Sequence, residues 1–256
     1  MEFEKFVDRL PSAQNAVDIF KDRWASTIPS VGNHLQSGNA PHFTMDNRPY
    51  MAAQAFGDVM ERLDGFDILE LGPLEGGHTY QLELLGAAVT AIEGNTEAFL
   101  KCLIVKELLN LKSKFYLGDF VKYLESSSKT YDMIFASGVL YHMPDPATVI
   151  KLICERTDKC FVWMHYWTAG AEKNGLTKRV PNKLKFLDMD LTYYNVDYGD
   201  TTSSGRFWGG LESYSSWMEK DEIELVFRRC GFTNFKIVEE APDHPSGPCF
   251  SFVTHR

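Results

Sequence analysis

The spacing of apolar residues changes character near residue 65 and divides the chain into two unlike parts. Before this point, one set of apolar side chains recurs at the four-, three- and four-residue intervals of a helical face, namely Ala13, Val17, Phe20 and Trp24. A loop rich in Pro, Gly, Asn and Ser follows at residues 27–49, and residues 50–63 form a second predicted helix. One amphipathic helix and a polar loop cannot bury a core of their own. We therefore expect residues 1–64 to form a helical cap over the rest of the chain.

Residues 65–256 alternate short apolar runs with helical stretches. The predicted strands are residues 66–71, 88–93, 114–117, 131–137, 159–165, 235–240 and 249–254, and the main predicted helices are residues 79–85, 96–109, 146–156 and 219–230. This alternation predicts an α/β fold with a doubly wound, mostly parallel seven-stranded sheet. Only a short Pro- and Gly-rich loop joins the last two strands, so the last strand is expected to run antiparallel.

One long segment interrupts this alternation after the fifth predicted strand. Residues 166–217 are rich in Tyr, Trp, Gly and Ser. A connection of this length inside a compact domain is usually functional. We expect the insertion to cover a binding site at the edge of the sheet.

Composition narrows the possible classes of protein. The chain has 44% hydrophobic and 24% charged residues, as globular proteins do, and its net charge of −9 argues against non-specific binding to nucleic acid. The five cysteines show no CxxC spacing, which indicates neither a metal site nor a disulfide framework and favours a reducing, cytoplasmic location. The acidic N-terminal segment does not resemble a signal peptide, and no apolar run approaches the ~18 residues of a membrane span.

Candidate chemistry lies at the carboxyl ends of the predicted strands, where open α/β sheets bind their ligands. The first strand runs into ELGPLEGG at residues 70–77. Leu74 stands where a dinucleotide-binding turn needs its middle glycine, and Glu70 and Glu75 would repel a pyrophosphate. The same acids favour a cationic ligand that carries a sulfonium and an ammonium group, which is S-adenosylmethionine.

The next three strands also end in residues suited to this ligand. Glu93 follows the second strand, 21 residues beyond Gly72, where an acid accepts hydrogen bonds from both ribose hydroxyls. Asp119 and Phe120 follow the third strand and are expected to bind the adenine amino group and to cover the ring. The fourth strand runs into SGVLYH at residues 137–142.

Together these segments resemble the motifs of class I S-adenosylmethionine-dependent methyltransferases. The resemblance covers residues 65–165 and, more loosely, residues 219–256; SGVLYH also resembles the subgroup that modifies wobble uridine in tRNA. It implies S-adenosylmethionine as cofactor. The expected cofactor contacts are Glu70, Gly72, Pro73, Gly76, Glu93, Gly94, Asn95, Asp119, Phe120, Ser137, Gly138 and His142, with Arg48 of the cap pairing with the methionine carboxylate.

Two histidines are the candidate catalytic residues. His142 and His165 end the fourth and fifth predicted strands, beside the expected position of the transferred methyl group. Either can take a proton from an oxygen or nitrogen acceptor. The alternative interpretation of His142 is a hydrogen bond on the cofactor side. Tyr141 and Tyr166 are expected to line the pocket, whereas His78 is interpreted as a surface histidine or one in the first turn of a helix.

The composition of the insertion indicates which kinds of methyl acceptor the site can bind. Four tryptophans lie in or beside it, namely Trp163, Trp167, Trp208 and Trp217. They form either an aromatic wall for a planar or apolar small molecule or a small core. A basic run can hold an anionic substrate or form a solvated face; it consists of Lys173, Lys178, Arg179, Lys183 and Lys185.

The sequence therefore predicts methylation of an oxygen or nitrogen atom of a small molecule. A tRNA-modifying transferase of the same fold is the first alternative, and a continuous basic surface leading to the pocket would indicate it. A cofactor-binding protein without catalysis is the second, and a pocket with no route to the methyl group would indicate that. No metal motif is visible, and the oligomeric state is left open.

Overall fold

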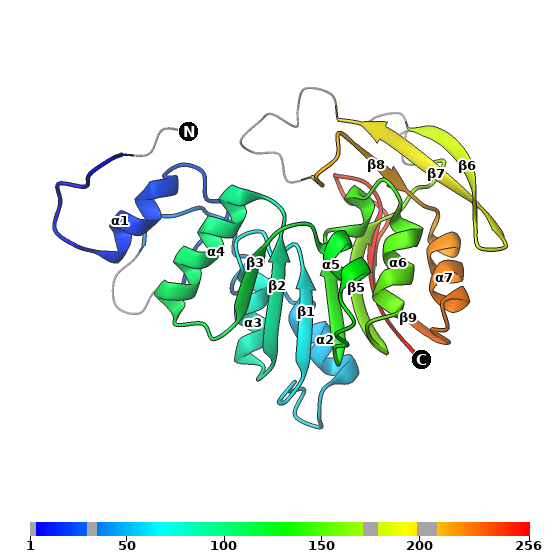
Figure 1. Cartoon of the computed structure of the whole chain (residues 1–256), viewed down its shortest axis with the longest axis horizontal. Helices are drawn as coiled ribbons and strands as arrows, with labels where there is room; N and C mark the ends of the chain where they lie inside the picture. The colour runs from blue at the N-terminus through cyan, green and yellow to red at the C-terminus, as the bar shows by residue number, and fades with distance from the viewer. Residues whose placement is uncertain (1–3, 30–34, 171–178, 199–208) are drawn as a thin grey trace.

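A seven-stranded sheet forms the centre of the molecule (Figure 1). The structure is a computed structural model, and it describes residues 4–29, 35–170, 179–198 and 209–256. The spatial order of the sheet is β3-β2-β1-β4-β5-β10-β9. The strands are β1 (Asp67–Leu71), β2 (Ala88–Glu93), β3 (Lys114–Leu117), β4 (Met133–Ser137), β5 (Lys159–His165), β9 (Asn234–Ala241) and β10 (Cys249–His255). These are the seven predicted strands, with ends that differ by at most two residues.

The strand directions confirm the predicted doubly wound sheet. β1 pairs in parallel with β2 and β4, and the pairs β2–β3 and β4–β5 are also parallel. β10 lies antiparallel between β5 and β9, as its short connection requires. The order of the strands reverses between β1 and β4. A doubly wound sheet binds its ligands at such a point, beside the carboxyl ends of the strands.

Helices cover both faces of the sheet. They are α2 (Arg48–Phe56) and α3 (Gly77–Leu84) on one face, α5 (Phe120–Ser126), α6 (Pro146–Cys154) and α7 (Lys220–Arg229) on the other, and α4 (Thr96–Leu109) near the β3 edge. Successive strand residues point to opposite faces. Ile68 accordingly packs with α2 and α3, whereas Leu69 packs with α6 and α7. Among the described helices, none combines the length and apolar composition of a membrane span.

Two helix predictions need correction. The helix expected at residues 50–63 occupies Arg48–Phe56, because Gly57 ends it and the Asp58 carboxylate then accepts the backbone N–H groups of Met60 and Arg62. Helix α5 was not among the predicted elements, although Asp119 caps it. The predicted start of α6 is confirmed, since Asp145 accepts the N–H of Thr148 and Pro146 occupies the first turn.

The insertion contains a second sheet that the sequence reasoning did not predict. Its strands are β6 (Val180–Phe186), β7 (Met189–Asp197) and β8 (Tyr214–Trp217), joined in that order in antiparallel pairs. Leu191 and Tyr193 of β7 are buried in the main core, and the Tyr193 hydroxyl donates to Asp145 Oδ1 at 2.5 Å. This sheet therefore docks where α6 begins, above the carboxyl edge of the main sheet (Figure 1).

The N-terminal segment packs on the rest of the chain. Helix α1 (Ala13–Val17) and a short 3-10 turn (Asp18–Phe20) carry the predicted apolar face, but the helical part stops before Trp24 and leaves Ala13 exposed. Val17, Phe20 and Trp24 are buried against α4 and the residues that follow it. The segment thus shares its core with α4.

Candidate functional site

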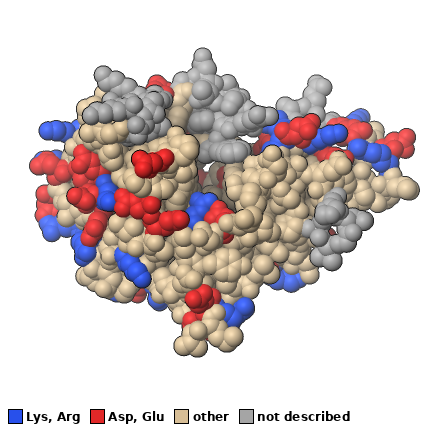
Figure 2. Space-filling model, turned by 180° about the vertical axis from the view of Figure 1, so that it is seen from behind, with Lys and Arg blue, Asp and Glu red and all other residues tan. Residues whose placement is uncertain are grey.

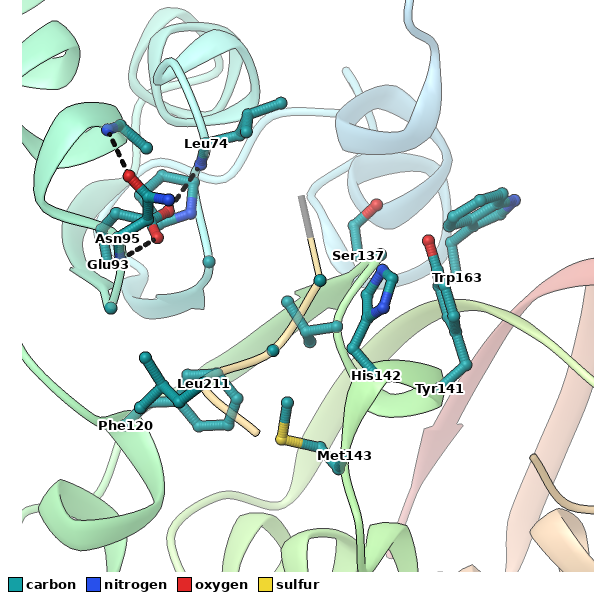
Figure 3. A pocket seen from close by; sticks show the side chains of 18 of the residues that line it. Leu74, Glu93, Asn95, Phe120, Ser137, Tyr141, His142, Met143, Trp163 and Leu211 are labelled. Atoms are coloured by element: carbon teal, nitrogen blue, oxygen red, sulfur yellow. Dashed lines mark hydrogen bonds between the residues drawn. The ribbon is translucent and has the colours of Figure 1, made fainter. Parts of the chain in front are cut away.

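A cavity of about 1210 Å³ lies over the carboxyl ends of the parallel strands. The segments that follow β1 to β5 line it, and cap residues and the second sheet complete its wall. Figure 3 shows Leu74, Glu93 and Asn95 at one end and Ser137, Tyr141, His142 and Trp163 at the other. The cavity is large enough for a cofactor and a second small molecule together.

The turn after β1 depends on left-handed backbone at three positions, Gly72 (φ 64°), Leu74 (φ 56°) and Gly76 (φ 81°). A Cβ atom on Gly72 would lie 2.6 Å from Val139 Cγ1, so the close approach of the two loops requires glycine there. Leu74 adopts the left-handed conformation despite its side chain. Its N–H donates to Glu93 Oε2 at 2.9 Å, which holds the turn against the loop after β2.

We expect Gly72→Ala to lower the free energy of unfolding by ~2 kcal/mol or more, because a methyl group is forced against Val139 at an unfavourable φ. Leu74→Gly is the matched control, since it removes a side chain where φ is already positive; its effect should stay within about 1 kcal/mol. Urea unfolding measures both. Equal effects of the two substitutions would contradict this account of the turn.

Glu93 connects the loops that follow β1 and β2. Its Oε1 accepts the N–H of Asn95 at 2.8 Å, and its Oε2 accepts that of Leu74 (Figure 3). Burial raises the pKa of Glu93, although the backbone hydrogen bonds act in the opposite direction. Each carboxylate oxygen keeps a second lone pair. Glu93 is therefore fixed in place and still able to accept two hydroxyl groups.

Two further predicted contacts serve as helix caps at the same end. Asn95 Oδ1 accepts the N–H of Ala98 at 3.0 Å and starts α4, and Asp119 Oδ1 accepts the N–H of Val121 at 2.8 Å and starts α5. Most of the predicted cofactor contacts line the cavity: Arg48, Gly72, Pro73, Glu93, Gly94, Asn95, Asp119, Phe120, Ser137, Gly138 and His142.

Glu70 and Gly76 are the two predicted contacts that do not line the cavity. Glu70 is 1% exposed and accepts a hydrogen bond from the Thr79 hydroxyl. Burial raises the pKa of Glu70 to about 8, against the effect of Thr79, and the charge of Glu93 raises it further. Gly76 supplies the left-handed cap of α3. Both residues therefore support the wall from behind instead of facing a ligand.

Arg48 reaches the other end of the cavity from the start of α2. Its Nη1 donates to Ser137 Oγ at 2.9 Å, and its guanidinium lies 4.8 Å from the centre of the Trp163 ring. Its Nε donates to Asp46 Oδ1 at 2.7 Å, and Nη2 bonds to Asp46 Oδ2. The structure thus brings Arg48 beside Ser137 at the end of β4.

His78 and Leu211 are cavity residues that sequence reasoning missed. His78 lies in the first turn of α3, one of its two predicted placements, but it is mostly buried and its Nε2 lies 2.9 Å from Asp46 Oδ2. Burial tends to raise the pKa of Asp46, but hydrogen bonds from Arg48 and His78 hold it well below its usual range. Leu211 lies over Gly94, where a Cβ atom would be 2.9 Å from Leu211 Cδ2. No local pattern marks either contact in the sequence.

Glu75 holds the cap to the body of the protein. Its Oε1 and Oε2 accept the backbone N–H groups of Ala25 and Ser26 at 3.0 and 2.9 Å, and Lys101 Nζ lies 3.1 Å from Oε1. The sequence interpretation assigned this acid to attraction of a cationic ligand. Its carboxylate is instead engaged by the cap and by Lys101.

We expect Glu75→Gln to loosen the cap, because an amide group cannot accept both backbone hydrogen bonds. Amide hydrogen exchange at Ala25 and Ser26 should accelerate at least about tenfold, the equivalent of ~1.4 kcal/mol. Glu155→Gln is the control, since Glu155 only pairs with Lys151 on an exposed helix surface. Unchanged exchange in Glu75→Gln would show that the cap is held elsewhere.

Aromatic rings enclose the end of the cavity around His165. The His165 ring stacks on Trp217 with 5.0 Å between ring centres, and Tyr141 meets His165 edge to face at 4.7 Å. Tyr141 lines the cavity as predicted, and Trp163 and Trp217 line it too, which is the first of their two predicted placements. Trp208 lies outside the described residues.

Tyr166 and Trp167 do not line the cavity, and the prediction for Tyr166 was wrong. Successive residues at the end of a strand point in opposite directions. Tyr166 therefore turns away from the cavity, and its hydroxyl donates to Glu240 Oε1 at 2.7 Å. Trp167 stacks on Tyr194 of the second sheet with 3.6 Å between ring centres.

Both candidate histidines are neutral near pH 7. Burial lowers the pKa of His142 to about 3, and its Nδ1 lies 3.0 Å from the Tyr198 hydroxyl. Burial also lowers the pKa of His165 to about 4, although its hydrogen bonds to Pro248 and Gly247 act the other way. Neutral imidazoles can accept a proton, which is what a general base requires.

The described members of the predicted basic run separate in the structure. Arg179 lines the cavity, with its guanidinium 3.8 Å from the centre of the Trp217 ring. Lys183 is exposed, and Lys185 pairs with Asp190 at 2.8 Å. Lys173 and Lys178 lie outside the described residues.

Comparison with known proteins identifies relatives of this architecture. Residues 63–185 match the family model of a methyltransferase domain. No curated protein sequence matches the chain.

Solved structures share the fold at low identity. The N-terminal domain of EvdMO1, solved with SAH and D-fucose, is 20% identical, with 95% of this chain and 94% of that one aligned at a TM-score of 0.69. An S-adenosylmethionine-dependent methyltransferase from Clostridium acetobutylicum is 11% identical over 83% and 92% of the two chains, at 0.54. The CcbJ methyltransferase from Streptomyces caelestis is 16% identical over 85% and 96%, at 0.52.

Proposed function

Because the chain belongs to the class I S-adenosylmethionine-dependent methyltransferases, we propose that it methylates an oxygen or nitrogen atom of a small molecule bound at the His165 end of the cavity. The observation that carries this proposal is the continuity of the cavity. Glu93 at the cofactor end and His165 at the aromatic end line the same space. A cofactor and an acceptor can therefore meet without protein between them, which favours catalysis over binding alone.

S-adenosylmethionine is the cofactor, and it supplies a methyl group that its sulfonium already activates. The Glu93 carboxylate suits the two ribose hydroxyls, and Asp119 with Phe120 suits the adenine. Arg48 and Ser137 suit the methionine end. Alignment of the two reactants can supply roughly 7–11 kcal/mol of the barrier reduction. Residues that hold the reactants therefore matter more than any single base.

Proton removal falls to a histidine at the acceptor end. His142 and His165 are both neutral and both line the cavity. His165 is the stronger candidate, because Nδ1 is occupied by the carbonyls of Gly247 and Pro248 at 2.9 and 3.2 Å. The opposite nitrogen is then left to accept a proton.

A small-molecule acceptor is favoured over tRNA by the distribution of charge. In Figure 2, acidic and basic side chains are interspersed, and the described residues on this face form no continuous basic band. The structure of the EvdMO1 N-terminal domain with D-fucose shows that one protein of this fold has been studied with a small sugar. Methyl transfer would be measured with a panel of small hydroxy and amino compounds and, in parallel, with tRNA. Methylation of tRNA but of none of the small molecules would overturn the proposal.

A further inference from the structure

Two histidines from different segments face the same end of the cavity. His165 ends β5, and His244 lies in the loop between β9 and β10; both line the cavity. Their ring centres are 5.3 Å apart and the rings are tilted by 58°. A ring nitrogen of each lies within 4.8 Å of the other and of Cys249 Sγ. The sequence reasoning gave His244 no role.

The hydrogen bonds of His165 determine which of its nitrogens carries the proton. Nδ1 lies 2.9 Å from the carbonyl oxygen of Gly247 and 3.2 Å from that of Pro248. Carbonyl oxygens only accept hydrogen bonds, so Nδ1 must carry hydrogen. In the neutral ring, Nε2 therefore carries no hydrogen, and its lone pair can accept a hydrogen bond. Because burial lowers the pKa of His165 to about 4, the neutral ring is the form present near pH 7.

The hydrogen bond of His244 selects the opposite tautomer of its neutral ring. The backbone N–H of Ser246 donates to His244 Nδ1 at 3.1 Å. An amide N–H only donates, so Nδ1 is the unprotonated nitrogen. The neutral His244 ring must then carry its hydrogen on Nε2. The two rings thus offer one acceptor and one donor.

We propose that His165 and His244 bind the acceptor's hydroxyl group between them, which makes the protein an O-methyltransferase. The hydroxyl donates its proton toward His165 Nε2 and accepts a hydrogen bond from His244 Nε2. The two ring centres are 5.3 Å apart, so one oxygen placed between the rings can reach both at the roughly 2.7–3.0 Å that a hydrogen bond spans. This inference rests on the proposed methyl transfer and names its substrate class, an alcohol or phenol.

The number of lone pairs on the acceptor atom favours oxygen over nitrogen as the attacking atom. A hydroxyl oxygen has two, so one can accept from His244 while the other forms the bond to the methyl carbon. A neutral amine has one, and a hydrogen bond from His244 would occupy the pair that must attack. A carboxylate has no proton to donate to His165. The pair of histidines therefore fits a hydroxyl group and disfavours both other acceptors.

The transfer step balances with these two residues. The acceptor oxygen bonds to the methyl carbon as the carbon–sulfur bond breaks, and the electron pair of that bond stays on sulfur. The hydroxyl proton moves to His165 Nε2 and later leaves to solvent. The products are a methyl ether, S-adenosylhomocysteine and a proton.

A metal ion is the competing occupant of this cluster. Two histidines and a cysteine are ligand types of Zn²⁺. A ligating imidazole needs a lone pair directed at the metal, whereas His244 Nδ1 already accepts the Ser246 N–H and its Nε2 carries hydrogen. Burial also raises the pKa of the Cys249 thiol, which opposes the thiolate that zinc requires. The hydroxyl interpretation is therefore favoured, and metal binding becomes an outcome of the test.

The test compares acceptors that share one scaffold and differ only in carrying a hydroxyl or an amino group. The full-length protein should methylate the hydroxyl member. His244→Leu should lower kcat/KM by at least about 100-fold, whereas His244→Gln keeps an N–H donor and should stay within about tenfold of the parent protein. Affinity for S-adenosylhomocysteine should remain within about twofold in both variants, which also shows that they are folded.

Three results would overturn the inference. One is preferential methylation of the amine, and another is unchanged turnover in His244→Leu. The third is activity that a chelator abolishes and Zn²⁺ restores, together with a thiolate charge-transfer band in the Co²⁺-loaded protein. Absence of methyl transfer to any small molecule would instead refute the proposed function itself.

Discussion

Substitution of Glu93 by alanine is expected to weaken binding of S-adenosylhomocysteine by at least about 100-fold, or ~2.7 kcal/mol. In the proposed binding mode the carboxylate accepts hydrogen bonds from two ribose hydroxyls, and hydrogen bonds to a charged group contribute roughly 1.5–3 kcal/mol each. Its loss also releases the N–H groups of Leu74 and Asn95, which hold the two loops in register. Isothermal titration calorimetry measures the change directly.

Glu93→Gln is the matched control for this experiment. It keeps the size of the side chain and one oxygen acceptor, so its affinity should fall between those of the parent protein and Glu93→Ala. A loss below about tenfold in Glu93→Ala would mean that the ribose is held elsewhere.

Substitution of His165 by alanine is expected to lower kcat by at least about 100-fold, with affinity for S-adenosylhomocysteine nearly unchanged. The variant loses the proposed proton acceptor, whereas the residues at the Glu93 end of the cavity stay in place. Residual activity should remain, because alignment of the reactants does not depend on the base. His142→Ala is the comparison, and an effect confined to His142 would assign the base to that residue. If neither substitution slows turnover, no histidine base is used.

The lowered pKa of His165 predicts how the rate of methyl transfer depends on pH. Neutral imidazole is the active form, and burial lowers the pKa of His165 to about 4. Protonation therefore removes the base only as the pH falls toward that value. The kcat/KM profile should be level around neutral pH and decline well below the ordinary histidine pKa of about 6.5. A decline centred near 6.5 would indicate a solvent-exposed histidine as the base.

Local patterns were sufficient to predict the sheet and to place most of the candidate cofactor residues along one cavity. Apolar runs indicated the strands, Asn95 and Asp119 combine cap chemistry with positions just after strands, and Asp145 marks the start of α6. Since parallel strands direct their carboxyl ends to one edge, the residues that follow them converge without further information. Leu74 shows the limit of motif matching, because its backbone adopts the glycine conformation although its side chain differs.

Contacts between distant loops were not predictable in the same way. The bonds from Glu75 to Ala25 and Ser26 join segments that share no periodic pattern. The same holds for His244, whose loop reaches the end of β5 only because β10 returns antiparallel beside it. The second sheet was missed for a different reason: β6 carries Pro181 and exposed lysines, which favoured a loop. The alternation of Leu191 and Tyr193 in β7 was a usable signal.

We propose that one cavity holds the cofactor at Glu93 and the acceptor at His165. A crystal structure with S-adenosylhomocysteine tests it most directly. We predict ribose hydroxyls on the Glu93 carboxylate and a sulfur atom that opens, without intervening protein, onto the space beside His165 and His244. Ribose hydroxyls bound to another residue, or a sulfur atom walled off from His165, would contradict the account.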